Sequence, residues 1–414
     1  SSVNGLGGLE YDPNTAGKFV AAFTDHGSSY FGKAIVGTVS GSSISLGSVA
    51  TFRSYGGDSN AISFDPTTAN SFLMAWEGYG PTGVYLKIGT ISGTSISFSS
   101  EVTITTASST EAVSVKYNPN TTTGVFIVQY QQSSAQKIAV CSRSGSSITI
   151  GTTYTFVSSY SNQAEVAFDP NVSGNGKFIT SYKDINNAGQ SVVGQLAATA
   201  LVPNVADFIG ITSAAITSGA SGDIVLKGGI AASVANTPLL QVYGSEVVFS
   251  TSNVGWPTMD FDPNTAGKFV AVYSDNGNSN YGTAIVGIVS GNSITYGSKF
   301  VFETAAANDI CISFDPNTAG KFVIAYQDAG SASNGTAIVG TVSGTSLSFG
   351  TKAVFNSGDS SNIGLDCDPN TANKYVISYR NSANNNEGIA LVGTVSGTSI
   401  SFGSKVTFTS GITG

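Results

Sequence analysis

Carboxylates that could hold a metal ion or catalyse hydrolysis recur in one short motif of the chain. The stretch FDPNTAGKFV occupies residues 261–270 and again 314–323, and residues 11–20 repeat it with Tyr11 in the first place. An acidic residue followed by Pro, Asn and Thr is compatible with a metal loop or a catalytic turn. It is also compatible with a structural turn, because Asp at the first position and Pro at the second suit a type I β-turn.

A comparison of the copies favours the structural turn. The anchor residue, always followed by Pro, recurs at Asp12, Asp65, Asn118, Asp169, Asp262, Asp315 and Asp368. Asn118 can cap a turn as Asp does, but it cannot replace a catalytic or metal-binding carboxylate. Five residues after the anchor, Gly and Asn interchange, for example at Gly17 and Asn70. These two residues tolerate a left-handed backbone best, so the repeats preserve a conformation.

The anchor residues mark a sequence repeat, and each repeat is predicted to consist of short strands. Their spacings are 53, 53, 51, 93, 53 and 53 residues. Each repeat contains four runs rich in β-branched and aromatic residues, which we name strands a to d; in the sixth repeat they read DICISFDP, KFVIAYQD, GTAIVGTVSG and SLSFGTKAVF. Seven such units predict an all-β fold, a seven-bladed β-propeller of four-stranded antiparallel blades. An open β-solenoid is the alternative.

The long fourth spacing indicates an insertion. We place it at residues 196–245, between propeller repeats 1–4 (residues 1–195) and the end of repeat 4 with repeats 5–7 (residues 246–414). Its segments FIGIT, GDIVLKGG and PLLQVYG read as strands of a small β module. The insertion follows strand c of repeat four, so we expect it to project from the face that carries the anchor turns and to contact a partner, unless it only elaborates one blade.

The two faces of the predicted propeller differ in sequence variety. The a–b and c–d connections share one face and are nearly the same in every ordinary repeat, so we name it the uniform face. The b–c and d–a connections share the other, variable face, which is where binding is commonly found. Its aromatic and acidic residues are Asp25, Tyr30, Tyr55, Asp58, Tyr79, Tyr160, Asp184, Trp256, Asp275, Tyr281 and Asp328. Aromatic rings beside carboxylates suit sugar recognition. Ordinary solvated loops are the competing interpretation.

Two further sets of residues point inward. Strand b carries an aromatic residue at or near one position in every repeat, which we interpret as core. Two residues before the anchors, Glu10, Asp260 and Asp366 approach the channel if strand a is innermost, and oxygen ligands there could hold a cation. We favour solvated channel residues, and we expect no resident metal or cofactor.

Composition excludes several classes of protein. The net charge is −8 with 17 basic and 25 acidic residues, so no nucleic-acid partner is expected. No apolar run is long enough for membrane insertion. Three cysteines at Cys141, Cys311 and Cys367 lack metal-ligand spacing and suit small buried side chains. The chain begins at Ser1 without a signal-peptide pattern, which fits a processed or recombinant N-terminus.

The repeats resemble a known group of proteins. GTAIVGTVSGTSLSFG (335–350) and GKAIVGTVSGSSISLG (32–47) are similar to tandem-repeat, tail-fibre-like structural proteins of marine phages, especially cyanophages, and to related bacterial repeat proteins. The segment 206–229 resembles a small β module found beside such repeats in phage virion proteins. The resemblance covers nearly the whole chain and implies a virion component, but it carries over no functional residue.

These observations lead to a ranked set of functions. We expect a non-enzymatic phage virion surface protein, such as a tail fibre, spike or decoration, on the virion surface or otherwise extracellular. It would bind a host cell-surface glycan or receptor, and the 196–245 insertion would contact other virion proteins. The alternative is a secreted bacterial lectin or adhesin. A propeller glycosidase is less favoured, because no pair of acidic residues stands out as the carboxylate pair that glycoside hydrolysis needs.

Overall fold

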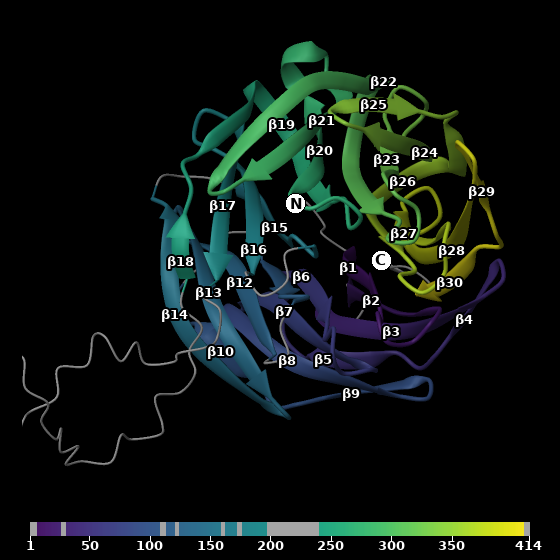
Figure 1. Cartoon of the computed structure of the whole chain (residues 1–414). Helices are drawn as coiled ribbons and strands as arrows, with labels where there is room; N and C mark the ends of the chain where they lie inside the picture. Colours follow the sequence, from purple (N-terminus) through teal and green to yellow (C-terminus); the bar gives the residue numbers. More distant parts are fainter. Residues whose placement is uncertain are drawn as a thin grey trace, which may run out of the picture.

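The structure is almost entirely antiparallel β-sheet. The computed structural model describes residues 6–25, 30–107, 113–120, 124–158, 162–171, 176–196 and 240–409. Within these ranges the strands are accompanied by one short 3-10 turn, η3 (Asn276–Asn278). The strands stand in radial groups around a central axis (Figure 1). None of the described residues form a helix of the length and hydropathy needed to cross a membrane.

The first radial group shows the unit, which we call a blade. It consists of β1 (Leu6–Tyr11), β2 (Lys18–Asp25), β3 (Phe31–Ser40), β4 (Ser43–Leu46) and β5 (Ala50–Arg53). The order is β1-β2-β3-β4, and β5 also pairs with β3, so strand d is made of two pieces. The break falls at Gly47, where a Cβ would lie 2.0 Å from the Thr94 carbonyl oxygen of the next blade. Strand d therefore bends around the neighbouring c–d hairpin.

The remaining strands follow the same plan. The second and third groups contain β6 (Gly57–Phe64), β7 (Ser71–Tyr79), β8 (Thr82–Ser92), β9 (Ser95–Phe98), β10 (Val102–Thr105), β11 (Ser114–Tyr117), β12 (Val125–Gln132), β13 (Ala135–Ser144) and β14 (Ser147–Val157). The later groups contain β15 (Asn162–Phe168), β16 (Lys177–Lys183), β17 (Ala188–Leu196), β18 (Leu240–Tyr243), β19 (Val247–Phe261), β20 (Lys268–Asp275), β21 (Tyr281–Ser290), β22 (Ser293–Phe314), β23 (Lys321–Asp328), β24 (Asn334–Ser343), β25 (Ser346–Phe349), β26 (Ala353–Cys367), β27 (Lys374–Asn381), β28 (Glu387–Ser396), β29 (Ser399–Phe402) and β30 (Val406–Thr409).

Three long strands pass from one blade to the next. The first half of β19 pairs with β17, and its second half pairs with β20. β22 and β26 behave in the same way. Each is strand d of one blade and strand a of the next. Every anchor counted in the sequence lies between strands a and b of an antiparallel unit, and the prediction of seven blades rests on these anchors.

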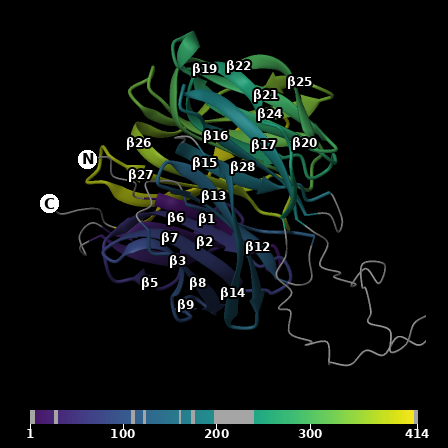
Figure 2. The same ribbon diagram turned by 90° about the vertical axis from the view of Figure 1, so that its left-hand side faces the viewer.

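Side-chain contacts close the ring between its first and last blades. The Asp366 Oδ2 atom on β26 accepts the backbone N–H of Tyr11 on β1 at 2.7 Å. Beside it, Asp368 Oδ2 accepts the N–H of Gly17 at 3.2 Å. Seen from the side, the purple first blade and the yellow last blade lie next to each other (Figure 2). The ring is thus closed by packing and hydrogen bonds, because β1 pairs in a sheet only with β2.

The core lies between the blades and confirms the predicted aromatic ladder. The strand b aromatic residues are all at most 3% exposed: Phe23, Trp76, Tyr130, Tyr182, Tyr273, Tyr326 and Tyr379. A second aromatic residue near the start of strand b, such as Phe19, packs against a glycine of strand c. At Gly37 a Cβ would approach the Phe19 Cζ atom to 2.1 Å, which explains the glycine within the IVGTVS run.

The predicted insertion needs a correction at its end. Its segments FIGIT and GDIVLKGG lie outside the described residues. Leu240–Tyr243, which we assigned to the module as part of PLLQVYG, instead forms β18 and pairs with β17 of the fourth blade. Gly244 N–H then bonds the Val193 carbonyl, as Gly47 N–H bonds Val36 in the first blade, both at 2.8 Å. Strand d of the fourth blade therefore begins before the predicted boundary at 245.

Candidate functional site

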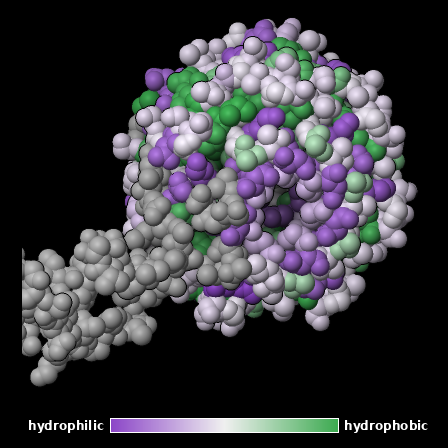
Figure 3. All heavy atoms as spheres, viewed as in Figure 1, coloured by the Kyte–Doolittle hydropathy of each residue, from purple (hydrophilic) through white to green (hydrophobic). Residues whose placement is uncertain are grey.

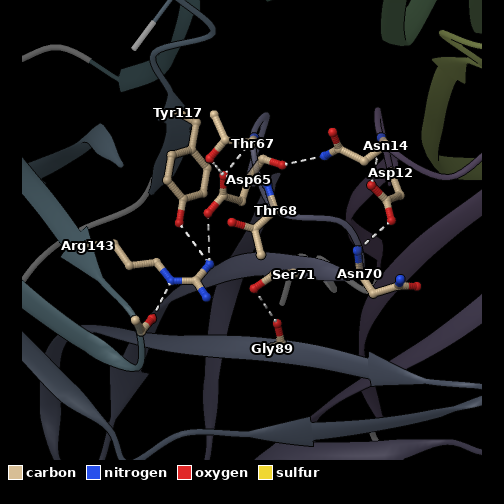
Figure 4. A network of polar contacts seen from close by, with 11 residues as sticks. Asp12, Asn14, Asp65, Thr67, Thr68, Asn70, Ser71, Gly89, Tyr117 and Arg143 are labelled. Atoms are coloured by element: carbon tan, nitrogen blue, oxygen red, sulfur yellow. Dashed lines mark hydrogen bonds and ion pairs between the residues drawn. The ribbon is translucent and has the colours of Figure 1, made fainter. Parts of the chain in front are cut away.

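The anchor aspartates hold the blades together. Asp12 Oδ1 accepts the N–H of Asn14 in its own turn at 2.9 Å, and its Oδ2 accepts the N–H of Asn70 in the next blade at 2.7 Å. The Asn14 side chain also reaches the Asp65 carbonyl at 2.9 Å (Figure 4). Each anchor turn is therefore locked to itself and to its neighbour, which confirms the structural interpretation of the motif.

The same bonds recur around the ring, with adjustments where the sequence departs from the pattern. Asp169 accepts the N–H of Gly267 and Asp315 that of Asn373, both at 2.8 Å. Asp65 instead pairs with Arg143 at 3.1 Å (Figure 4). Where the structure describes them, the residues five places after the anchor adopt the left-handed conformation predicted for them, with φ of 69° at Gly17 and 62° at Asn70.

Most of the predicted acidic residues of the variable face are occupied within their own blades. Asp25 pairs with Lys33, Asp275 with Lys299 at 2.9 Å and Asp328 with Lys352 at 3.8 Å. Asp184 accepts the N–H groups of Asn186 and Ala188 at 2.8 Å each. These carboxylates hold the b–c loops in shape. The structure does not bring them together in one site.

The predicted aromatic residues fall into different surroundings. Tyr30 is 53% exposed, and Tyr281 is half-buried at the start of β21. Tyr160 lies outside the described residues. Tyr55, Asp58 and Tyr79 do come together in the second blade, where Tyr79 donates to Asp58 at 3.3 Å and Tyr55 donates to Glu101 at 3.0 Å. We name these four residues the tyrosine cluster.

A buried arginine shapes the loops beside the tyrosine cluster. Arg53 is 1% exposed, and its guanidinium donates to the carbonyls of Tyr30 at 3.1 Å, Tyr55 at 3.0 Å and Gly57 at 2.6 Å. Burial lowers its pKa to about 10. A buried cation needs several acceptors, and here the loop carbonyls supply them. The arginine therefore fixes where the neighbouring tyrosines are presented.

The central channel of the ring forms a cavity with a volume of about 710 Å³. Figure 3 looks along the axis and shows the hollow with hydrophilic residues around it and on its floor. Alternate residues of strand a face the channel: in β19, Trp256, Thr258 and Asp260 are accessible, whereas Pro257 and Met259 are buried. Counted back from the anchor, positions six, four and two form what we call the mouth layer, the middle layer and the inner layer.

The mouth layer opens on the variable face and contains Trp256, Asp309 and Asn362. Trp256 is 40% exposed and lines the cavity. Its side chain bonds the Asp309 carboxylate, which also accepts the N–H of Asn362 at 3.1 Å. All three residues have positive φ, 46°, 46° and 51°, at β-bulges. Such a backbone conformation is costly for residues other than glycine, and it clusters at binding sites.

Further polar groups lie beside Asp309 in the sixth blade. Asn308 donates to Gln327 at 2.9 Å, and Gln327 donates to Asp359 at 2.9 Å. Burial raises the pKa of Asp309, and the nearby Asn362 N–H and Arg380 guanidinium oppose that rise. The mouth therefore places an exposed indole beside carboxylates, amides and a guanidinium group.

The inner layer contains the predicted channel carboxylates and a lysine. Asp260 accepts the N–H of Phe314 in the next blade at 2.8 Å, and Glu10 accepts that of Phe64 at 3.3 Å. The Lys116 ammonium lies 3.4 Å from Glu10 Oε2. Among the described residues, no group of three or more His, Cys, Asp or Glu could hold a metal ion. Lys116 places a positive charge of the chain itself among these carboxylates.

Burial and mutual repulsion shift the acidity of these groups. Burial raises the pKa of Asp260 to about 7. Burial and then the charge of Glu10 raise that of Asp366, also to about 7. Burial would lower the pKa of Lys116, but the surrounding carboxylates, Glu10 first, hold it above its ordinary value. The inner layer is thus a coupled ionic network that bridges several blades.

Comparison with known proteins tests the fold. No family model and no curated protein matches the chain. A protein from Lactobacillus plantarum is similar in structure, with a TM-score of 0.59 and 11% identity over 96% of this chain and 98% of that one. Sqt1 from Chaetomium thermophilum is also similar, with a TM-score of 0.53 and 8% identity over 95% of this chain and 82% of that one. A putative 6-phosphogluconolactonase from Bacteroides uniformis has a TM-score of 0.52 and 8% identity over 96% of this chain and 95% of that one.

By fold, the chain is a β-propeller. At these identities the likeness shows the fold alone, and it confirms the predicted architecture of antiparallel blades. Two residues of the propeller channel were missed as site candidates: Asp309 beside Trp256, and Glu165 in the middle layer. Both lie an even number of residues before an anchor. In a strand, residues an even number of positions apart share a face, so the sequence rule used for the inner layer could also have identified Asp309 and Glu165 as channel residues.

Proposed function

We propose that this propeller is a non-enzymatic carbohydrate-binding protein whose main site is the channel mouth. The observation that carries the proposal is the exposed indole of Trp256, held in a strained backbone conformation and hydrogen-bonded to Asp309. An indole can pack on the apolar face of a sugar ring, while neighbouring carboxylate and amide groups bond its hydroxyls. Asp309, Asn308 and Gln327 supply such groups here.

The state of the channel carboxylates supports binding without catalysis. Glycoside hydrolysis needs one carboxyl group as acid and another as base or nucleophile, both free to face the substrate. Asp260 accepts the backbone N–H groups of Phe261 and Phe314, and Asp366 accepts that of Tyr11. The bonds to Phe314 and Tyr11 join strands of neighbouring blades, which is a structural role. Assays with fluorogenic glycosides test this part, and turnover abolished by Asp260→Asn would contradict it.

We further propose that the protein works at the surface of a phage virion, as a tail fibre, spike or decoration. Support comes from the repeat resemblance and from the insertion in the fourth blade, which lies at the c–d position and leads us to propose contact with other virion proteins. A secreted bacterial lectin or adhesin is the alternative. Labelling of purified virions by an antibody against this chain tests the virion location, and binding only to bacterial culture fluid would favour the alternative.

A glycan array followed by titration tests the carbohydrate site. We expect Trp256→Ala to weaken binding at least about tenfold, because the stacking platform is lost. Val354→Ala is a matched control: Val354 is 51% exposed on β26 but lies in strand d at the outer edge. An array signal that Trp256→Ala leaves unchanged would exclude the mouth as the site.

A further inference from the structure

We propose that the channel takes the chain end of a neutral, unbranched glycan, with the terminal sugar inserted past Trp256 into the middle layer. This inference rests on the proposed carbohydrate function and specifies the ligand of that same site. It distinguishes binding of a chain end from binding along the length of a chain. The geometry of the three channel layers carries it.

The channel wall is continuous because the ring is closed. The contacts of Asp366 and Asp368 with Tyr11 and Gly17 join the last blade to the first. A linear polymer bound in the channel must therefore enter along the axis, since no gap between these blades lets it pass sideways. Successive strand residues rise about 3.3 Å. The mouth and inner layers, four residues apart on strand a, are thus separated by about 13 Å.

The middle layer leaves space between the mouth layer and the inner layer. Six of its residues have small side chains: Gly8, Ala61, Ser114, Thr258, Cys311 and Gly364. The seventh, Glu165, bonds the Thr258 hydroxyl and the Met259 N–H of the adjacent strand. The whole channel, from Trp256 to the prolines of the anchor turns, has a volume of about 710 Å³, which falls in the range typical of ligand sites.

The inner layer limits how far a ligand can travel. Lys116 and Glu10 come from the third and first blades, so their ion pair spans the channel in front of the second blade. Four of the seven side chains at this level are charged, Glu10, Lys116, Asp260 and Asp366, whereas the middle layer has one charged side chain, Glu165. A chain that enters at Trp256 therefore meets the Lys116–Glu10 ion pair after about 13 Å. Such a site ends the bound segment instead of letting a polymer run through.

The charges of the channel select against acidic sugars. Among the described residues, four carboxyl groups, Glu10, Glu165, Asp260 and Asp366, line the cavity with one lysine, Lys116. A channel lined mainly by one sign of charge repels a ligand of that sign. We therefore expect neutral glycans to enter and, above about pH 7 where Asp260 and Asp366 are ionised, uronic acids to be excluded.

Calorimetry with defined oligosaccharides tests the proposal. The probes are cello-, malto- and chito-oligosaccharides of two to six units, with oligogalacturonates as acidic counterparts. We expect at least one neutral series to bind with a stoichiometry of one protein per oligosaccharide and with the same Kd for oligosaccharides of every length. We expect oligogalacturonates not to bind. Affinity that grows with length, several proteins per chain, a preference for the acidic series, or no neutral binding would overturn the proposal.

Variants of the middle layer separate this inference from the proposed function. Ala61→Phe and Ser114→Phe, tested independently, fill the chamber from two blades and should each weaken binding at least tenfold. Thr51→Phe on the exposed outer edge is the control, and melting temperatures verify folding. If Trp256→Ala abolishes binding but a folded chamber variant does not, carbohydrate binding stands and chain-end entry fails. If Trp256→Ala has no effect, the proposed function itself fails.

Discussion

Asp12 of the first blade accepts the backbone N–H of Asn70 in the second blade at 2.7 Å, and the same carboxylate closes its own turn through Asn14. One side chain thus fixes a turn and joins two blades. At the ring closure, Asp368 makes the equivalent bond to Gly17. Because this bond between neighbouring blades recurs around the ring, the anchor motif is nearly the same in every repeat.

Removal of this carboxylate should loosen the contact between the blades. We expect Asp12→Ala to lower the free energy of unfolding by about 3 kcal/mol, because two partly buried N–H groups lose a charged acceptor that is itself buried. Asp12→Asn should cost less, about 1 to 2 kcal/mol, since Asn118 serves at the third anchor. Chemical denaturation measures both. A loss below about 0.5 kcal/mol for the alanine variant would show that the bond does not contribute.

The bend of strand d around the neighbouring hairpin gives a second prediction. A Cβ at Gly350 would lie 1.7 Å from the Thr398 carbonyl oxygen, whereas a Cβ at Gly344 would meet nothing within 4 Å. Gly344→Ala should cost only about 1 kcal/mol, for its positive φ. Gly350→Ala should cost clearly more, about 3 kcal/mol, because two blades must separate. Equal melting temperatures for the two variants would contradict this packing.

Stability should depend on pH through the inner layer. The folded-state pKa of Asp366 is raised to about 7 from an ordinary value of 3.8. The folded protein then binds more protons than the unfolded chain between about pH 4 and 7, so the contribution of Asp366 to stability is lost as pH rises through that window. Asp260 shifts in the same direction. Asp366→Asn should be most harmful at about pH 4 and progressively less harmful up to pH 7.

Denaturation of the variant and the wild type across pH 4 to 8 measures this difference. Glu101→Gln, on the exposed outer part of the second blade, controls for the loss of a negative charge outside the channel. A difference between Asp366→Asn and wild type that stays constant with pH would show that Asp366 titrates alike in the folded and unfolded states.

The sequence predicted the parts of this molecule that depend on local pattern. Strand order, the turn role of the anchors and the burial of the strand b aromatics follow from residue types repeated at fixed spacing. The ion pair of Asp275 could not be predicted in this way. Its partner Lys299 lies 24 residues away and reaches Asp275 only because of the register of β21 and β22. Asp309 and Trp256 were also out of reach as a pair. They come from different blades, and each sits on a bulge that changes where its side chain points.

The contact between those two residues supplies the last prediction. If Asp309 positions the indole, Asp309→Ala should free Trp256 and make its fluorescence more accessible to acrylamide. The other tryptophan, Trp76, is fully buried and contributes a constant background. Asp309→Asn retains an acceptor for the indole N–H and should restore most of the protection. Sugar affinity should follow the same order, with the alanine variant weakest. Asp25→Asn, on the same face but paired with Lys33 in the first blade, should leave quenching unchanged. Identical quenching in the wild type and Asp309→Ala would mean that the bulge alone holds Trp256 in place.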